Sequence, residues 1–262
     1  MELKQDLKAV ALDLDGTLLN SKKRLSSRSI ASLRACLSRS IIVIIATGRP
    51  PRSVRQFLPP DILHRVELVC YNGALTFDTL GHSHSEWIPS SLSVRILNDV
   101  RKNVNQAYLS VESEDHLFTT MPPEIIHSQR FLFTPSTMSF QELVKIPANK
   151  ILVSHFTTGL PVIEKYRKET SFVVTDGGSL VQMMRKGVSK ASGVDRICRM
   201  KKISMSEVMA FGDDTNDLAL FHTCGVPVAM DNAIERVKQS ASLITRSNDE
   251  DGVAVILEQL LH

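Results

Sequence analysis

The chain is poor in the features that mark disulfide-stapled and membrane-spanning proteins. It has four cysteines in 262 residues, and none of them forms a C-x-x-C pair, which favours free thiols in a reducing compartment. Its longest apolar run, residues 41–46, is far shorter than a membrane span, and residues 1–6 show no signal-peptide core. We therefore expect a cytoplasmic protein with no membrane partner.

Charge of one sign is also scarce. The net charge is +3 and no dense stripe of lysine and arginine is present, so the sequence predicts no nucleic-acid partner. Eight histidines occur, but none lies in a polar motif that could form a site, which argues against zinc. With 43% hydrophobic and 23% charged residues, the composition is that of an ordinary globular protein with one large domain or two modest ones.

Strand and helix patterns alternate in the first third of the chain. Apolar strands are predicted at 8–14, 41–46 and 68–71, and a helix capped by Ser26 or Ser27 is predicted to run to about Leu37. This βαβαβ order implies a parallel sheet. Similar patterns return after residue 189, with a helix at 190–199 and a strand at 207–211.

The texture between these two parts is different. Turn signals are frequent between residues 81 and 185, and they separate short strand candidates at 107–111, 150–155, 172–175 and 180–184. Helices are predicted at 91–102 and 161–169. We therefore predict an α/β protein with a doubly wound, Rossmann-like parallel-sheet core formed by residues 1–82 and 186–262, interrupted by an inserted α+β cap domain at 83–185.

The most informative segment is the end of the first predicted strand. Asp13 and Asp15 lie two residues apart, so on an extended strand their side chains point the same way, and Gly16 allows a sharp turn after them. Taken alone, an Asp-Gly pair is equally typical of a solvated turn. The position matters because ligands of open α/β sheets bind at the carboxyl ends of the strands.

Polar residues follow three other core strands, and this convergence favours a site. The four groups are Asp13 with Asp15, Thr47 with Gly48, Asn72 with Gly73, and Asp213, Asp214, Asn216 and Asp217. Carboxylates such as Asp13 and Asp213, with a backbone carbonyl near Asp15, suit Mg²⁺. The hydroxyl of Thr47, the N–H of Gly48 and the ammonium of Lys190 suit a phosphate group.

Four segments together resemble the signatures of the haloacid dehalogenase-like (HAD) hydrolase superfamily. They are residues 13–17, 46–49, 186–190 and 212–217, in that order along the chain. The insertion between the second and third segments is placed as in the Cof-type phosphatase subfamily, whose cap is a large α+β (class IIB) domain. Residues 228–233 and 247–254 also resemble that subfamily.

This resemblance implies a role for each matching residue. Asp13 would be the nucleophile that forms an aspartyl-phosphate, and Asp15 the general acid and base. The resemblance places the metal on Asp13, Asp15, Asp213 and Asp217, and leaves open whether Asp214 or Asp217 gives the support. It implies that phosphate or substrate is bound by Leu14, Thr47, Gly48, Arg49, Asn72, Lys190 and Asn216. Arg49 could instead be a structural salt-bridge residue.

The predicted function is a Mg²⁺-dependent phosphatase for small phosphorylated metabolites, with sugar phosphates as the first class. The alternatives are a phosphotransferase resembling phosphomannomutase and a non-catalytic, phosphate-binding regulatory protein. A small-molecule phosphate ester is the expected partner, and the protein is expected to be a monomer or weak homodimer. Nothing in the insertion identifies the residues that set specificity.

Overall fold

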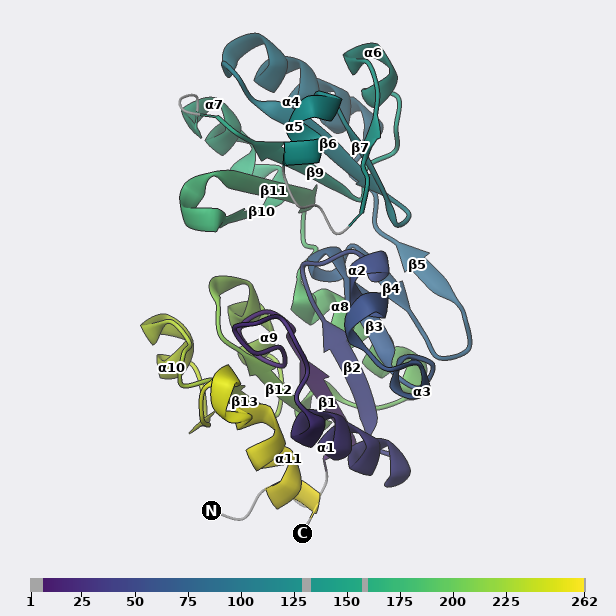
Figure 1. Ribbon diagram of the computed structural model, residues 1–262, viewed down its shortest axis with the longest axis vertical. Coiled ribbons are helices and arrows are strands. Elements are labelled where there is room, and N and C mark those ends of the chain that lie inside the picture. The colour runs from purple at the N-terminus through teal and green to yellow at the C-terminus, as the bar shows by residue number, and fades with distance from the viewer. Residues whose placement is uncertain (1–6, 129–132, 157–159, 262) are drawn as a thin grey trace. The chain divides into compact units, whose positions relative to one another are not determined.

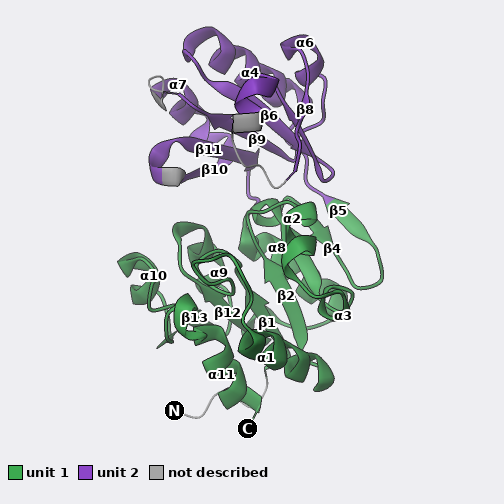
Figure 2. Ribbon diagram, in the orientation of Figure 1, with its two compact units in different colours: residues 1–84, 189–262 green, residues 85–188 purple. Residues whose placement is uncertain are grey.

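The computed structural model describes residues 7–128, 133–156 and 160–261, and these form two compact units. Residues 1–84 and 189–262 make up the first unit, and residues 85–188 make up the second (Figure 2). The second unit is therefore inserted between two segments of the first. None of the described helices is both long and apolar enough to cross a membrane.

The first unit is built on an eight-stranded sheet with the order β14-β13-β12-β1-β2-β3-β4-β5 (Figure 1). The strands are β1 (Ala9–Leu12), β2 (Ile42–Ala46), β3 (Glu67–Cys70), β4 (Leu75–Phe77), β5 (Ser83–Ser85), β12 (Val208–Gly212), β13 (Val226–Ala229) and β14 (Leu243–Ile244). Neighbours from β14 to β3 pair in parallel, whereas β3 and β4 pair antiparallel. Crossover connections between parallel strands fit the predicted doubly wound core.

Strand β1 lies at the centre of this sheet because its side chains can be buried on both faces. All four of its residues are buried, and Ala9 is in register with Ile42 of β2 on one side and Val208 of β12 on the other. A continuous apolar run is what a parallel strand covered by helices requires. The strand is shorter than the predicted span of 8–14, because the chain leaves the ladder after Leu12.

Helices cover both faces of this sheet. The helices are α1 (Ser27–Ser38), α2 (Pro51–Phe57), α3 (Pro60–Leu63), α8 (Lys190–Lys201), α9 (Leu218–Phe221), α10 (Glu235–Gln239) and α11 (Gly252–Leu261). Helix α1 packs beside α11, and α8 packs on β2 and β3 (Figure 1). The side chain of Ser26 accepts a hydrogen bond from the N–H of Ser29, so the predicted cap is present at the first of the two serines proposed.

The second unit has a six-stranded sheet with the order β10-β11-β9-β6-β7-β8. Its elements are α4 (Ser90–Asn103), β6 (Tyr108–Ser113), β7 (His116–Thr119), α5 (Pro123–Ser128), β8 (Ser136–Thr137), α6 (Phe140–Leu143), β9 (Lys150–Ser154), α7 (Leu160–Glu164), β10 (Thr170–Thr175) and β11 (Leu180–Arg185). All pairs are antiparallel except β7 with β8. This mixture of helices with a mainly antiparallel sheet is the predicted α+β class.

Some predictions for this unit were wrong in detail. The helix predicted at 161–169 is α-helical only to Glu164, and residues 165–168 form a 3₁₀ turn. Strand β7 was not predicted, because its four residues have no clear apolar alternation. Its position is set by the turn at Glu114 and Asp115, both of which have positive φ angles, and by pairing with β6. Turn conformation and tertiary pairing therefore decided this strand.

Candidate active site

Three carboxylates meet at the carboxyl ends of β1 and β12. One ligand oxygen each from Asp13, Asp213 and Asp217 can be chosen so that all lie within 4.8 Å of one another. Asp13 is the residue after β1, and its backbone N–H donates to the carbonyl of Phe211 in β12 over 3.2 Å. The pairing of two adjacent parallel strands thus places carboxylates about 200 residues apart in the sequence at one point of the sheet edge.

Lys190 provides the cation in contact with this cluster. It is the first residue of α8, only 1% of its surface is exposed, and its Nζ lies 2.6 Å from Asp13 and 2.7 Å from Asp217. The second oxygen of Asp217 accepts the backbone N–H groups of Asp213 and Asp214. Asp217 therefore supports the cluster from below, whereas the side chain of Asp214 caps the following turn at Thr215.

Burial and mutual repulsion make the carboxylates hard to ionise. Burial raises the pKa of Asp13 well above its usual value, the ammonium of Lys190 lowers it, and the charges on Asp217 and Asp213 raise it. Burial and then the charge on Asp217 raise the pKa of Asp213 to about 6. For Lys190, burial lowers the pKa, but Asp13 and Asp217 outweigh it and the pKa is raised. A cluster of this kind favours a further cation.

Asp15 lies outside the three-carboxylate cluster and forms its own ion pairs. Its carboxylate accepts the Nε and Nη2 of Arg49 at 2.5 and 2.7 Å, and the Nζ of Lys23 at 2.7 Å. Burial would raise the pKa of Asp15, but these hydrogen bonds and charges lower it below its usual value. Arg49 is further fixed by Ser53 and by the ring of Phe57, 4.9 Å below its guanidinium. The structure thus gives Arg49 a salt bridge with a predicted catalytic residue.

The predicted phosphate-binding residues after β2 and β3 lie together. The N–H of Asn72 donates to the carbonyl of Thr47, and the Nδ2 of Asn216 donates to the Oδ1 of Asn72 over 3.0 Å. A Cβ on Gly48 would come within 3.2 Å of that same Oδ1, which explains the small residue there. Asn72 is 3% exposed and its φ is +55°, and its Nδ2 has no hydrogen-bond partner among the described residues.

The loop after β1 is shaped by Gly16. Its φ is +77°, and a Cβ there would lie 2.2 Å from the Oδ2 of Asp213, so glycine is needed for both conformation and space. Leu14 between the two aspartates is fully buried, and its carbonyl accepts the N–H of Leu19. Thr17 donates its hydroxyl to Asp213 over 2.9 Å.

Two asparagines that sequence reasoning gave no role support this loop. The Nδ2 of Asn232 donates to the carbonyl of Gly16 over 2.8 Å, and its Oδ1 accepts the N–H of Asn248. The side chain of Asn248 in turn donates to the carbonyl of Leu19. Both asparagines belong to the C-terminal segments that resembled the Cof-type subfamily, so that resemblance was the available signal.

A model of the haloacid dehalogenase-like hydrolases matches residues 10–257, and the chain belongs to this family. The match spans both segments of the first unit and the whole insertion. The protein is thus an enzyme of the phosphoric monoester hydrolase class, on a Rossmann-like α/β core.

Individual relatives agree with this class. The chain is 29% identical over 262 residues to the 5-amino-6-(5-phospho-D-ribitylamino)uracil phosphatase YitU of Bacillus subtilis, covering 95% of this chain and 96% of the relative. A haloacid dehalogenase-like hydrolase from Bacteroides thetaiotaomicron has a TM-score of 0.82 at 26% identity, covering 97% and 99%. The subclass IIB sugar phosphatase BT4131 has the same fold, with a TM-score of 0.82 at 23% identity, covering 96% and 98%.

Proposed function

We propose that the protein is a Mg²⁺-dependent phosphatase that hydrolyses small phosphorylated metabolites through an aspartyl-phosphate. The observation that carries this proposal is the buried contact of Lys190 with both Asp13 and Asp217, beside Asp213. Asp13 is the nucleophile: its carboxylate oxygen attacks phosphorus in line as the bond to the leaving alcohol breaks. Water then cleaves the aspartyl-phosphate and releases inorganic phosphate.

The acidic cluster fits a magnesium ion. Its possible ligand atoms are hard carboxylate oxygens, which Mg²⁺ prefers, and their raised pKa values show that Lys190 alone leaves negative charge uncompensated. Asp13 and Asp213 would hold the ion, and Asp217 would orient the site through its contacts with Lys190 and the backbone at Asp213. A carbonyl near Asp15 is a further proposed ligand. When bound, the ion supplies charge stabilisation to the transferring phosphoryl group.

Asp15 is proposed to act as the general acid for the leaving alcohol and then as the base for the attacking water. In the structure its carboxylate is held by Arg49 and Lys23. The acid role requires a proton on this carboxylate, so substrate binding must weaken at least one of the two ion pairs. An incoming phosphate monoester competes for the guanidinium of Arg49, because phosphate is a strong bidentate acceptor.

The phosphoryl oxygens are proposed to be held by the polar residues after β2 and β3 and by two residues of the first unit's C-terminal segment. Asn72 is the informative member, because a buried amide nitrogen without a partner is costly unless a ligand or water satisfies it. The set consists of Thr47, Gly48, Arg49, Asn72, Lys190 and Asn216, with the backbone of Leu14. Oriented donors of this kind stabilise charge that develops during phosphoryl transfer.

The remaining assignments are also proposals. We assign catalysis to the first unit and substrate selection to the insertion, whose exclusion of water would favour transfer to the substrate-derived phosphoryl group over side reactions. Sugar phosphates are the first substrates to test, supported by the name of BT4131, followed by the ester named for YitU. A cytoplasmic location is supported by four free cysteines, Cys36, Cys70, Cys198 and Cys224. A monomer or weak homodimer remains the expected state.

The decisive experiment is the substitution Asp13→Asn, assayed for phosphate release from p-nitrophenyl phosphate with and without Mg²⁺. We expect turnover by the natural protein to need Mg²⁺ and the variant to lose it, while its melting curve stays cooperative. Asp61→Asn, which removes a surface partner of Arg34, is the matched control and should keep full activity. Unchanged Mg²⁺-dependent turnover by the Asp13 variant would overturn the proposed function.

A further inference from the structure

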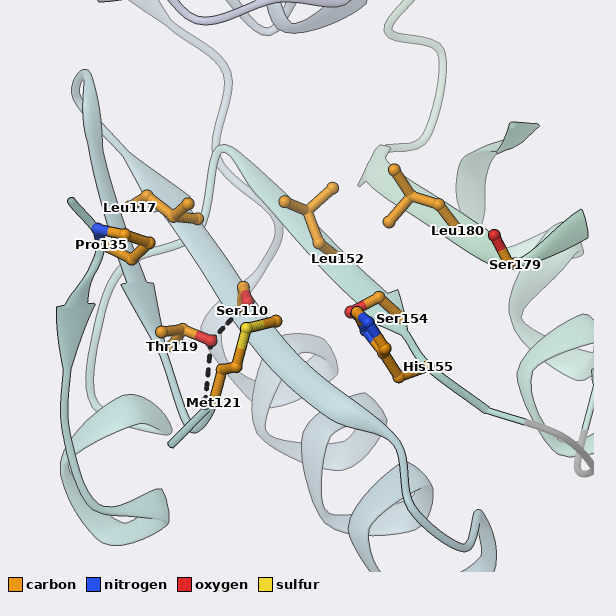
Figure 3. A pocket seen from close by; sticks show the side chains of 10 residues that line it. All are labelled: Ser110, Leu117, Thr119, Met121, Pro135, Leu152, Ser154, His155, Ser179 and Leu180. Carbon is orange, nitrogen blue, oxygen red and sulfur yellow. Dashed lines mark hydrogen bonds between the residues drawn. The ribbon is translucent and has the colours of Figure 1, made fainter. Parts of the chain in front are cut away.

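The inserted unit contains a pocket on the face of its sheet opposite α4. Alternate residues of the strands, including Val111, Ile151 and Val181, are buried in the core beneath the helices. Their neighbours Ser110, Leu152 and Leu180 therefore lie on the other face, where the pocket is found (Figure 3). Its volume is about 270 Å³. A cavity of about 150 Å³ already admits benzene, so this one can hold a single ring with its substituents.

The lining of this pocket is mainly apolar. Ten described residues line it: Ser110, Leu117, Thr119, Met121, Pro135, Leu152, Ser154, His155, Ser179 and Leu180. None of these ten carries a carboxylate, an ammonium or a guanidinium. A phosphate dianion would be poorly solvated there, so the pocket does not suit the phosphoryl end of a substrate.

The polar atoms in the pocket are largely engaged with one another. The hydroxyl of Ser110 donates to Thr119 over 2.8 Å, and the Oγ1 of Thr119 accepts the N–H of Met121 (Figure 3). The Nδ1 of His155 lies 3.1 Å from the hydroxyl of Ser154. A polyol placed here would find few free partners for its hydroxyl groups, and each hydroxyl buried without one is unfavourable.

We propose that this pocket binds the alcohol part of the substrate, and that this part is a compact, uncharged, mainly apolar group. The proposal rests on the proposed function and narrows its substrate class. The cluster around Asp13 and Lys190 provides charges and amides suited to the phosphoryl group, whereas Leu152 and Leu180 offer partly exposed apolar surface suited to the rest. Esters of apolar alcohols are therefore better substrates than polyol esters of the same size, and the expectation shifts away from simple sugar phosphates.

The test compares cyclohexylmethyl phosphate with glucose 6-phosphate in the presence of Mg²⁺. Both are esters of a primary alcohol next to a six-membered ring, and they differ mainly in the hydroxyl groups. We expect kcat/KM to be about tenfold or more higher for the cyclohexyl ester, the scale of discrimination that hydrophobic pockets achieve. An equal or higher kcat/KM for glucose 6-phosphate overturns the proposal, as does failure to cleave either ester by a protein that cleaves p-nitrophenyl phosphate.

A variant locates the preference. Leu152→Asn keeps the side-chain size but places an amide in the pocket, and should reduce the ratio of the two kcat/KM values about tenfold. Val94→Asn, on the exposed side of α4, is the matched control and should leave the ratio unchanged. A ratio that is unaffected by Leu152→Asn, or reduced equally by both changes, rejects this pocket as its source.

A measurement without any variant covers the case in which Leu152→Asn does not fold. Cyclohexylmethanol should inhibit hydrolysis of cyclohexylmethyl phosphate competitively, and glucose at the same concentration should not. Equal inhibition by both alcohols, or none by cyclohexylmethanol, contradicts the proposal. The function itself is judged separately: if Asp13→Asn abolishes turnover of every ester while the apolar preference is missing, the phosphatase stands and only the pocket assignment fails.

Discussion

The Nζ of Lys190 lies 2.6 Å from the Oδ1 of Asp13, although 177 residues separate the two in the chain. The residue carrying the ammonium begins a helix of the C-terminal segment, and the aspartate ends the central strand of the N-terminal one. Because both groups are almost fully buried, each needs the other to remain charged. This pair therefore joins the two segments at the site that we assign to catalysis.

Replacing Lys190 by methionine tests the importance of this contact. We expect kcat/KM to fall about 10²–10³-fold, the loss typical of removing one oriented electrostatic donor. Stability should fall by about 3 kcal/mol because two carboxylates lose their buried counter-charge. Lys201→Met is the matched control, because it also breaks a lysine pair with a buried carboxylate, that of Glu67, but away from the cluster. A similar loss of kcat/KM in both variants would contradict the catalytic assignment of Lys190.

The raised pKa of Asp213 gives a prediction about pH and magnesium. An ordinary aspartate has a pKa of about 4, and that of Asp213 is raised to about 6, so the folded protein binds the extra proton more tightly than the unfolded chain. Ionising Asp213 thus reduces stability as pH rises from about 4 to 6. Mg²⁺ requires the ionised form, so its stabilising effect should appear as pH rises through about 6.

Thermal melts with and without Mg²⁺ check this expectation. The increase in Tm on adding Mg²⁺ should be larger at about pH 7.5 than at about pH 5. Asp213→Asn should lose the pH-dependent part of this increase, whereas Asp61→Asn should keep it. Equal increases at both pH values in the natural protein would show that protonation of this cluster does not compete with the ion.

The support of the loop after β1 by Asn232 can be tested by substitution with alanine. This change removes the hydrogen bond to the carbonyl of Gly16 and the one accepted from Asn248. We expect a loss of about 1–2 kcal/mol in stability and a higher Mg²⁺ concentration for half-maximal activity, because the loop also carries Asp13 and Asp15. Asn98→Ala, which removes one exposed hydrogen bond within α4, should change neither quantity measurably. An unchanged Mg²⁺ requirement in the Asn232 variant would limit this residue to a structural role.

The site residues were predictable to the extent that strand ends predict proximity. Asp13, Thr47, Asn72 and Asp213 each follow an apolar strand, and parallel strands of one sheet must present these ends at one edge. The pairing partners were not predictable in the same way. Nothing in the spacing of Asp13 and Asp15 reveals that one contacts Lys190 whereas the other contacts Arg49 and Lys23. Sharing one strand end did not give the two aspartates one environment.

By itself the sequence determined the class of fold and the chemistry available at the sheet edge, because burial patterns and turn residues are local properties of the chain. Only the tertiary structure decided which carboxylates share a buried cation, because that depends on how α8 and β12 pack against β1. The same holds for the support given by Asn232 and for the pocket beside Leu152, since strand register sets which side chains share a face.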